Sequence, residues 1–482
     1  MKTVGRPIVT GITPNLFAIL ALLSWPAIAL CLFRAPQAGQ AVLWTILGAQ
    51  LLLPVGTSIK FEMVPAFDKN SIATLSALLA CFLARRRPLR FAAGFGTPEV
   101  LILMVLTCPF VTAELNSDPI RAGEARLPGI GHYDALSASV VQFIFFVPFL
   151  LGRQILRTSA DNMEVLRALV VAGLIYSVPM LFEVRMSPQL HTWIYGYFPH
   201  SFGQQMRDGG FRPVVFMGHG LSVAFFAMTT VVAGAAFWRT GVRVFRLPPG
   251  AITAYLGVVL VLCKSLGSFV YGAALVPLIC LAKPRLQIRV AVVLVSIALL
   301  YPTMRVTDLF PTTFLVDMAA SVSTDRAKSL KFRFDQEEQL LEHAWERFSF
   351  GWGRFGRSRV YDEDSGRDLS VTDGHWIITM GQFGFIGFLA EFGLLALSVF
   401  RAATTLRYAD TLHDQVFLAA LALILAINLV DLLPNASLTP FTWLLAGTLL
   451  GRTETLRAAA RHRRVRWNVS PSLDSGAMGM KN

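Results

Sequence analysis

The sequence predicts an all-α fold, a polytopic bundle of membrane helices. Of its 482 residues, 54% are apolar and only 15% are charged, whereas soluble domains have about 25% charged residues. Apolar runs of about 20 residues recur along the chain, and a helix of that length spans ~30 Å of hydrocarbon. This composition excludes disordered, collagen-like and small disulfide-linked proteins.

The apolar runs predict 12–13 spans. In chain order they cover 14–33, 40–57, 70–84, 98–114, 135–152, 164–182, 216–237, 250–264, 266–282, 289–304, 376–400, 414–430 and 437–451. The stretch 250–282 fits two short helices that turn at Lys264-Ser265, or one long tilted helix.

Basic residues sort the loops into two groups, because they follow alternate spans. Such residues are Arg85, Arg86, Arg87, Arg90, Arg153, Arg157, Arg239, Arg243, Arg246, Lys283, Arg285, Arg289, Arg401 and Arg407, with six more arginines after 451. Cytoplasmic loops are rich in Lys and Arg, so this side and the C-terminus are predicted to be cytoplasmic. The rule explains the net charge of +13 without a nucleic-acid partner. Alternation places Lys2 and Arg6 on the other side, so the N-terminal topology stays open.

The opposite side carries the longer loops 56–69, 115–134, 183–215 and 305–375. We divide the chain into a transmembrane bundle (1–304), a large extracytoplasmic loop (305–375), C-terminal transmembrane helices (376–451) and a basic cytoplasmic tail (452–482). A helix near 324–348 is expected in the large loop, lying on the membrane or capping the bundle. Its apolar residues recur on one helical face: Leu330, Phe334, Leu341, Trp345 and Phe348.

Arg212 and His219 form the first candidate site, where a long outer loop joins a span. An arginine presents five N–H donors in a planar fork, which suits a phosphate group. Lys264, at a predicted outer turn, is a further candidate for such an anion. Alternatively, Arg212 only anchors the chain at the interface, beside neighbouring aromatic residues.

The large loop supplies more candidate cations. Arg326 and Arg333 lie seven positions apart and therefore share a helical face. Arg354 follows in the glycine-rich segment 351–356. The alternative is a solvated surface on which these bases pair with the glutamates of 337–346.

Asp373 and His375 flank a glycine where the large loop re-enters the bundle. A carboxylate can orient a histidine ring and stabilise its protonated form, which makes a general base. The alternative is a surface histidine at a helix start. Glu391 is the only acid well inside a predicted span, and a charge there marks a function or a buried partner.

Motifs for nucleotide or metal chemistry are missing from the sequence. It contains no GxxxxGK[ST] loop, no HExxH motif and no Cys/His cluster. It therefore predicts neither ATP as an energy source nor a bound metal, and we expect no cofactor.

The order of the motifs over about 180–400 resembles a known superfamily. A large outer loop ends in Gly351-Trp352-Gly353-Arg354-Phe355-Gly356, and His375 then precedes Gly384-Phe385-Ile386-Gly387 and Glu391-Phe392-Gly393-Leu394. This pattern resembles the O-antigen ligase and Wzy-type O-antigen and exopolysaccharide polymerase superfamily of bacterial envelope proteins. Trp376 departs from the residues common after the family's histidine.

The resemblance implies a metal-independent, GT-C-like glycosyltransferase of the bacterial inner membrane. Its donor would be an undecaprenyl-diphosphate-linked oligosaccharide, its acceptor a growing glycan, and its active face periplasmic. The resemblance implies that Arg212 and Arg326 or Arg333 hold the diphosphate and that His375, with Asp373, lies at the acceptor hydroxyl. His219, Lys264 and Arg354 are the further substrate-binding candidates. Membrane lipid, a chain-length regulator and a flippase are the implied partners.

We therefore expect a polymerase of lipid-linked repeat units. One alternative is an O-antigen ligase that transfers the glycan to lipid A core or another acceptor. Another is a polysaccharide transporter or flippase without covalent chemistry.

Overall fold

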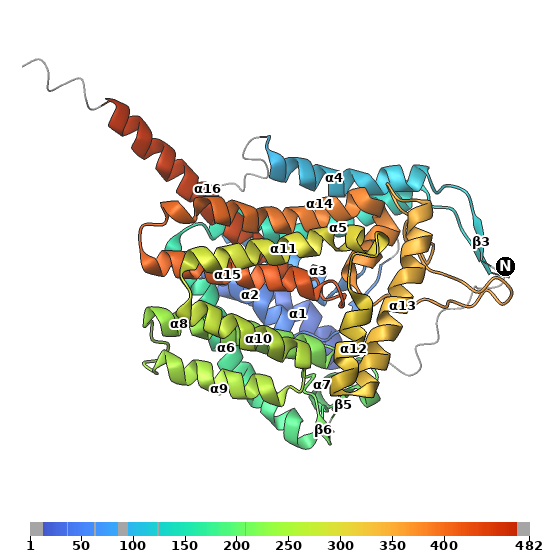
Figure 1. Cartoon of the computed structure of the whole chain (residues 1–482), viewed down its shortest axis with the longest axis horizontal. Coiled ribbons are helices and arrows are strands. Elements are labelled where there is room, and N and C mark those ends of the chain that lie inside the picture. Colours follow the sequence, from blue (N-terminus) through green and yellow to red (C-terminus); the bar gives the residue numbers. More distant parts are fainter. Residues whose placement is uncertain are drawn as a thin grey trace, which may run out of the picture.

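In the computed structural model the chain forms a bundle of long helices (Figure 1), and 72% of it is helical. The structure describes residues 13–35, 37–61, 64–84, 95–122, 125–207 and 209–469. Sheet within these ranges is limited to three antiparallel pairs: β1 (Ser58–Ile59) with β2 (Phe67–Asp68), β3 (Ile120–Ala122) with β4 (Ala125–Leu127), and β5 (Met206–Arg207) with β6 (Gly210–Phe211). The predicted all-α class is confirmed.

Every predicted span coincides with a helix. These helices are α1 (Leu16–Leu32), α2 (Ala38–Leu52), α3 (Lys69–Ala84), α4 (Thr97–Glu114), α5 (His132–Ile155), α6 (Ser159–Met186), α8 (Gly220–Thr240), α9 (Pro249–Leu262), α10 (Leu266–Leu281), α11 (Pro284–Val306), α14 (His375–Thr405), α15 (Leu412–Asp431) and α16 (Pro440–Val469). Seven of them, α4, α5, α6, α8, α11, α14 and α15, are long and apolar enough to cross a membrane. These helices support the expectation of a membrane protein. The total number of membrane crossings stays a prediction.

The stretch 250–282 forms two helices, α9 and α10. Lys264 separates them with a φ of 51°, in the left-handed region that non-glycine residues rarely adopt. The first of the two predicted alternatives is therefore the one observed.

One end of the bundle, here called the basic end, is held together by ion pairs. Arg153 of α5 contacts Glu99 of α4 and Glu454 of α16 at 2.8 and 2.7 Å. Arg452 of α16 pairs with Asp414 of α15. The ends of these helices therefore meet there, as the alternation of the basic loops requires.

Some predicted basic segments fall outside the described residues. They are Lys2, Arg6, residues 85–90 and the end of the tail from 470 onward. The described start of the predicted tail continues α16 as far as Val469, so the last helix does not end near 451.

The opposite end, here called the loop-rich end, carries the longer connections. The Asn15 side chain, just before α1, donates to the Ile194 carbonyl at 2.8 Å. The first helix therefore begins at this end, as simple alternation predicts. The helices outside the predicted spans lie there: α7 (Leu190–Tyr195), η1 (Phe202–Gln205), α12 (Thr312–Val322) and the longer α13 (Thr324–Glu346), whereas η2 (Leu406–Tyr408) follows α14.

Helices α12 and α13 lie across the loop-rich end, at the right of Figure 1. Helix α13 confirms the helix expected near 324–348. The predicted apolar face is confirmed only in part: Leu341 is buried, as expected, but Trp345 is 51% exposed. The buried face also contains Ala344 and the carboxyl group of Glu337, which a pattern of large apolar residues does not reveal.

Helix α15 occupies the core of the bundle. Every side chain from Val416 to Ile427 is buried, and the helix contacts α8, α11, α14 and α16. A helix that is apolar on all sides can be enclosed by its neighbours in this way.

Helix α14 is sharply broken at Gly384. The φ of 67° and ψ of −169° there belong to a region that is almost restricted to glycine. His375 Nε2 lies 3.3 Å from Glu391 Oε1, and Thr379 Oγ1 donates to Glu391 Oε2 at 2.9 Å. In a straight helix, positions 375 and 391 would be ~24 Å apart. Residues 375–383 therefore fold back on the rest of α14, and the continuous span predicted over 376–400 is interrupted.

The glycine-rich loop is bonded to this break. Two N–H groups just after Gly384 donate to the Phe348 and Ser349 carbonyls, and those of Trp352 and Gly353 donate to carbonyls just before it. A broken membrane helix exposes backbone groups that need partners, and the loop supplies them. The segment 351–356 therefore has a structural role.

Candidate functional site

Arg212 and Lys264 lie side by side at the loop-rich end. Arg212 Nε and Nη2 donate to the Lys264 carbonyl at 3.1 and 3.0 Å. Lys264 Nζ donates in turn to the Arg207 carbonyl at 3.0 Å. These bonds tie the β5–β6 hairpin to the turn between α9 and α10. Arg212 thus anchors the chain, as the alternative expects, and also places positive charge at this end.

His219 caps the start of α8. Its Nδ1 accepts a hydrogen bond from the Leu221 N–H at 3.0 Å, so the ring proton is on Nε2, which faces Gln204 Oε1 at 3.4 Å. Burial, and then nearby groups that include the guanidinium groups of Arg212 and Arg333, lower the pKa of His219 to about 4. The ring is therefore neutral at pH 7 in positive surroundings.

Arg333 brings α13 to the same place. Its Nε lies 3.3 Å from Asp373 Oδ2, and its Nη1 donates to the Pro434 carbonyl at 3.4 Å. Arg212 packs against Gly220, next to His219, whereas the contacts of Arg333 are with Asp373 and Pro434, and its charge reaches His219 only through space. Arg326 lies near the start of α13, and its side chain is outside the described residues.

His375 does not take its carboxylate from Asp373. Asp373 pairs with Arg333, whereas His375 contacts Glu391, and both side chains of that second pair are 19% exposed. The buried partner expected for Glu391 is therefore His375, together with Thr379. A histidine held by a glutamate retains the chemistry of a general base.

A buried carboxyl group that the sequence had assigned to a solvated face joins three helices. Glu337 of α13 accepts hydrogen bonds from Tyr301 Oη at 2.8 Å and Trp376 Nε1 at 3.3 Å. Arg305 Nε lies 3.7 Å from it. Burial raises the pKa of Glu337 despite these partners. This contact holds the first part of α14, which carries His375, against α11 and α13.

Arg354 is not among the residues that surround His219. It lines a separate groove together with Lys60 and one side of α5.

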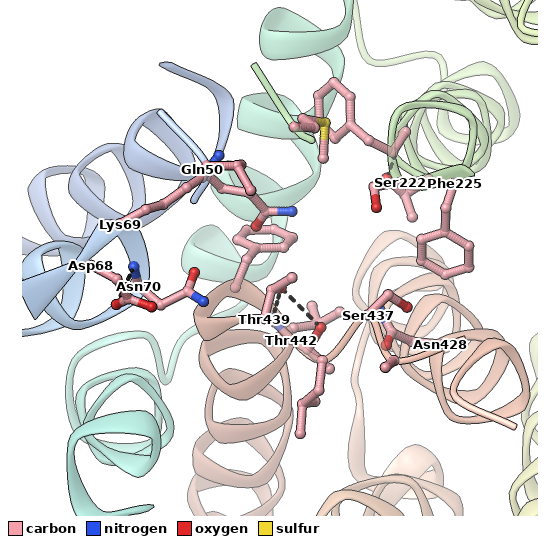
Figure 2. Close-up of a pocket in the computed structure, with 18 of the residues that line it drawn as sticks. Gln50, Asp68, Lys69, Asn70, Ser222, Phe225, Asn428, Ser437, Thr439 and Thr442 are labelled. Atoms are coloured by element: carbon pink, nitrogen blue, oxygen red, sulfur yellow. Dashed lines mark hydrogen bonds between the residues drawn. The ribbon is translucent and has the colours of Figure 1, made fainter. Parts of the chain in front are cut away.

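A cavity of about 280 Å³, here called the polar cavity because amide and hydroxyl groups are set among its apolar side chains, also opens at the loop-rich end. Figure 2 shows Gln50, Asp68, Lys69 and Asn70 on one side and Ser222 with Phe225 on the other, and it also labels Asn428, Ser437, Thr439 and Thr442. Apolar residues such as Ile424, Phe441 and Leu445 form much of the remaining lining. Lys69 Nζ donates to the Phe216 carbonyl at 2.9 Å. The Gln50 side-chain oxygen is buried without a hydrogen-bond partner among the described residues. The cavity thus offers amide and hydroxyl groups to a small polar ligand, beside the ionisable side chains of Asp68 and Lys69.

Several residues that line the cavity are close in sequence to the predicted site residues or their contacts. Met217 and Ser222 flank His219, and Ser437 follows Pro434, which Arg333 contacts. Gln50, Asn70 and Asn428 were not predicted. Their signal is weak, since each is a single amide within or beside a span, although polar residues there often mark a pathway or a site.

The arrangement combines three chemical properties. Arg212 and Arg333 can stabilise an anion, the His375–Glu391 pair can accept a proton, and the cavity can hold a polyol. Protein-family models and curated proteins show no significant match to the chain. The resemblance therefore rests on the sequence motifs alone.

Proposed function

We propose that the protein polymerises undecaprenyl-diphosphate-linked oligosaccharide repeat units at the periplasmic face of a bacterial inner membrane. The observation that carries the proposal is that Arg212, bonded to the Lys264 carbonyl, packs beside His219 at the start of α8, whose Ser222 lines the polar cavity. The positive-inside rule assigns the basic end to the cytoplasm. The loop-rich end then faces the side on which the lipid-linked donor presents its sugars.

The proposed reaction is the transfer of a glycosyl group. The hydroxyl oxygen of the acceptor sugar forms a bond to the anomeric carbon of the donor. The bond between that carbon and the phosphate oxygen breaks, and its electron pair leaves with the diphosphate. Fixed cations such as Arg212 and Arg333 stabilise the charge that develops on this leaving group. The hydroxyl proton passes to His375, and Glu391 stabilises the imidazolium.

The polar cavity and the covering helices suit the sugar part of such a substrate. Amide groups such as those of Gln50 and Asn428 both donate and accept hydrogen bonds, as sugar hydroxyls require. At about 280 Å³, the cavity is close to the ~300 Å³ lower limit of ligand pockets. Helices α12 and α13 lie across the same end of the bundle, where a cover would exclude the water that otherwise hydrolyses the donor.

The test is turnover of an undecaprenyl-diphosphate oligosaccharide by the purified protein in detergent. We expect free lipid diphosphate together with longer glycans. Arg212→Ala should lower the rate by about 10²–10³-fold, the loss seen when one charge-stabilising donor is removed. The matched control is Arg239→Ala, because Arg239 Nη1 donates to the Ile279 and Cys280 carbonyls at the opposite end of the bundle.

Each outcome separates the functions. Loss of turnover in Arg212→Ala but not in Arg239→Ala supports the proposal, and equal activity of the two variants removes Arg212 from the mechanism. Lipid diphosphate released only when lipid A core is added identifies a ligase. A donor that stays intact under all conditions rules out a transferase and leaves a transporter. His375→Ala with parental activity at pH 7 removes His375 as the base.

A further inference from the structure

A recess lies at the basic end of the bundle, where α11 begins and α14 connects to α15. This recess, here called the arginine cleft, has a volume of about 660 Å³, and ligand pockets range over roughly 300–1,000 Å³. It is lined by Arg285 and Arg289 of α11, Arg407 of η2 and Gln415 of α15. The described residues that line it include no carboxylate. The arginine cleft therefore carries a net positive charge.

The two acids near the start of α15 are paired with other residues. Asp410 Oδ2 lies 2.8 Å from Arg463 Nη2, and Asp414 pairs with Arg452. Both of these arginines belong to α16, which does not line the arginine cleft. The acids of this connection therefore leave the charge of the cleft uncompensated.

The three arginines of the cleft are available to an anion from outside the protein. Among the residues that the structure describes, the side chains of Arg285 and Arg289 make no hydrogen bond and no ion pair. Arg407 Nη2 donates to Tyr408 Oη at 2.8 Å, and its guanidinium carbon lies 4.8 Å from the centre of that ring. This contact orients Arg407 and leaves its other N–H groups available. A phosphate in the cleft would thus meet guanidinium donors from both α11 and η2.

The start of α11 favours an anion for a second reason. Its first turn contains no acid, and the Lys283 side chain at its N-cap makes no capping hydrogen bond. The N-terminus of a helix carries a partial positive charge, which stabilises anions and disfavours cations. Lys283 and Arg285 nevertheless add two like charges there, whereas the positive-inside rule requires only that they lie on this side of the membrane. A bound anion would offset this repulsion.

An apolar wall continues from the arginines along α11. Arg285, Arg289, Val292 and Val293 all line the cleft, and their spacings of three and four residues place them on one helical face. From 285 to 293 this face extends ~12 Å along the helix. Val293 is 57% exposed, so the wall opens on the outer surface of the bundle. Charge at the helix start followed by hydrocarbon is the order in which a phospholipid presents its phosphate and its acyl chains.

We propose that the arginine cleft binds an acidic glycerophospholipid of the cytoplasmic leaflet, with its phosphate on Arg285, Arg289 and Arg407. One acyl chain then lies along Val292 and Val293. Basic pockets between membrane helices on the cytoplasmic side bind such headgroups. A zwitterionic lipid carries an ammonium group that the guanidinium groups repel, so the site selects lipids with a net negative charge. The inference does not depend on the proposed function, because the cleft lies at the end of the bundle opposite the candidate functional site.

The test is binding of phosphatidylglycerol to the full-length protein in detergent, measured by native mass spectrometry with phosphatidylethanolamine as the reference lipid. We expect the protein to retain phosphatidylglycerol preferentially. Arg289→Gln should weaken this binding by about tenfold, the loss of one charge-assisted hydrogen bond. The matched control is Arg243→Gln, because Arg243 is an exposed arginine of the α8–α9 connection that does not line the cleft. Ala403→Phe puts a larger side chain into the lining of the cleft without a change of charge, and it should also weaken binding.

Three results would overturn the proposal. They are equal affinity of the Arg289→Gln and Arg243→Gln proteins, equal retention of the two lipids by the parent protein, and displacement of the lipid by an equal concentration of glycerol phosphate. The last result would identify a site for soluble phosphate compounds rather than for a lipid. If Arg289→Gln fails to fold, Arg407→Gln and Ala403→Phe test the same cleft, and parental affinity in both would contradict the proposal.

Discussion

Replacing Gly384 by alanine should destabilise the fold at the break in α14. A Cβ at this position would lie 2.4 Å from the carbonyl carbon of Ser349, well inside contact distance. The backbone there is in a conformation that costs a non-glycine residue about 1–3 kcal/mol. Forcing an extra methyl group into a packed site costs a further ~1–3 kcal/mol. We therefore expect a loss of roughly 2–6 kcal/mol in the free energy of unfolding.

Straightening α14 would relieve this strain. That change would separate His375 from Glu391, because a continuous helix places these positions ~24 Å apart. We therefore also expect Gly384→Ala to lose turnover of the lipid-linked donor. Both effects depend on the same broken helix.

The assay is equilibrium unfolding in mixed micelles, with Gly393→Ala as the matched control. Gly393 lies in the same helix, and the nearest atom to its added Cβ, Leu101 Cδ2, is 3.9 Å away. The control should keep or gain stability, since alanine favours a helix over glycine by about 1 kcal/mol. If the two variants unfold alike, the break at Gly384 is not required and the reasoning is refuted.

Three further predictions concern single side chains at the loop-rich end. Arg357 is 0% exposed, and its replacement by alanine should lower the free energy of unfolding by roughly 2–4 kcal/mol, because buried carbonyl groups lose their donors. Arg359→Ala breaks only an exposed ion pair and should change this free energy by no more than about 1 kcal/mol. Thermal unfolding compares the two variants. Because burial raises the pKa of Glu337, its contribution to stability is fully present below the ordinary carboxyl pKa and is lost as the pH rises through the higher folded value. Glu337→Gln should therefore flatten the decline of the melting temperature with rising pH, and an unchanged profile would contradict the buried carboxyl group. His219→Asn should keep the cap of α8, whereas His219→Leu should lose about 1 kcal/mol, and equal melting temperatures would show that the Leu221 N–H does not need the cap.

The helices and their approximate limits follow from the sequence, because a membrane helix is specified locally by a run of apolar residues. The helix over 324–348 is an equally local feature, whereas the turn at Lys264 was one of two alternatives that the sequence left open. The gathering of basic residues at one end also follows once the helices alternate in direction. These features need no knowledge of which helices touch.

Pairings between distant residues came only from the packed bundle. The partner of His375 is Glu391 rather than nearby Asp373, because Gly384 reverses the chain and residues 348–353 satisfy the exposed backbone. Glu337 is buried rather than solvated, because α13 lies across the ends of α11 and α14. The polar cavity joins Gln50, Asn70 and Asn428 from three helices, and no local pattern in the chain records that three such ends meet.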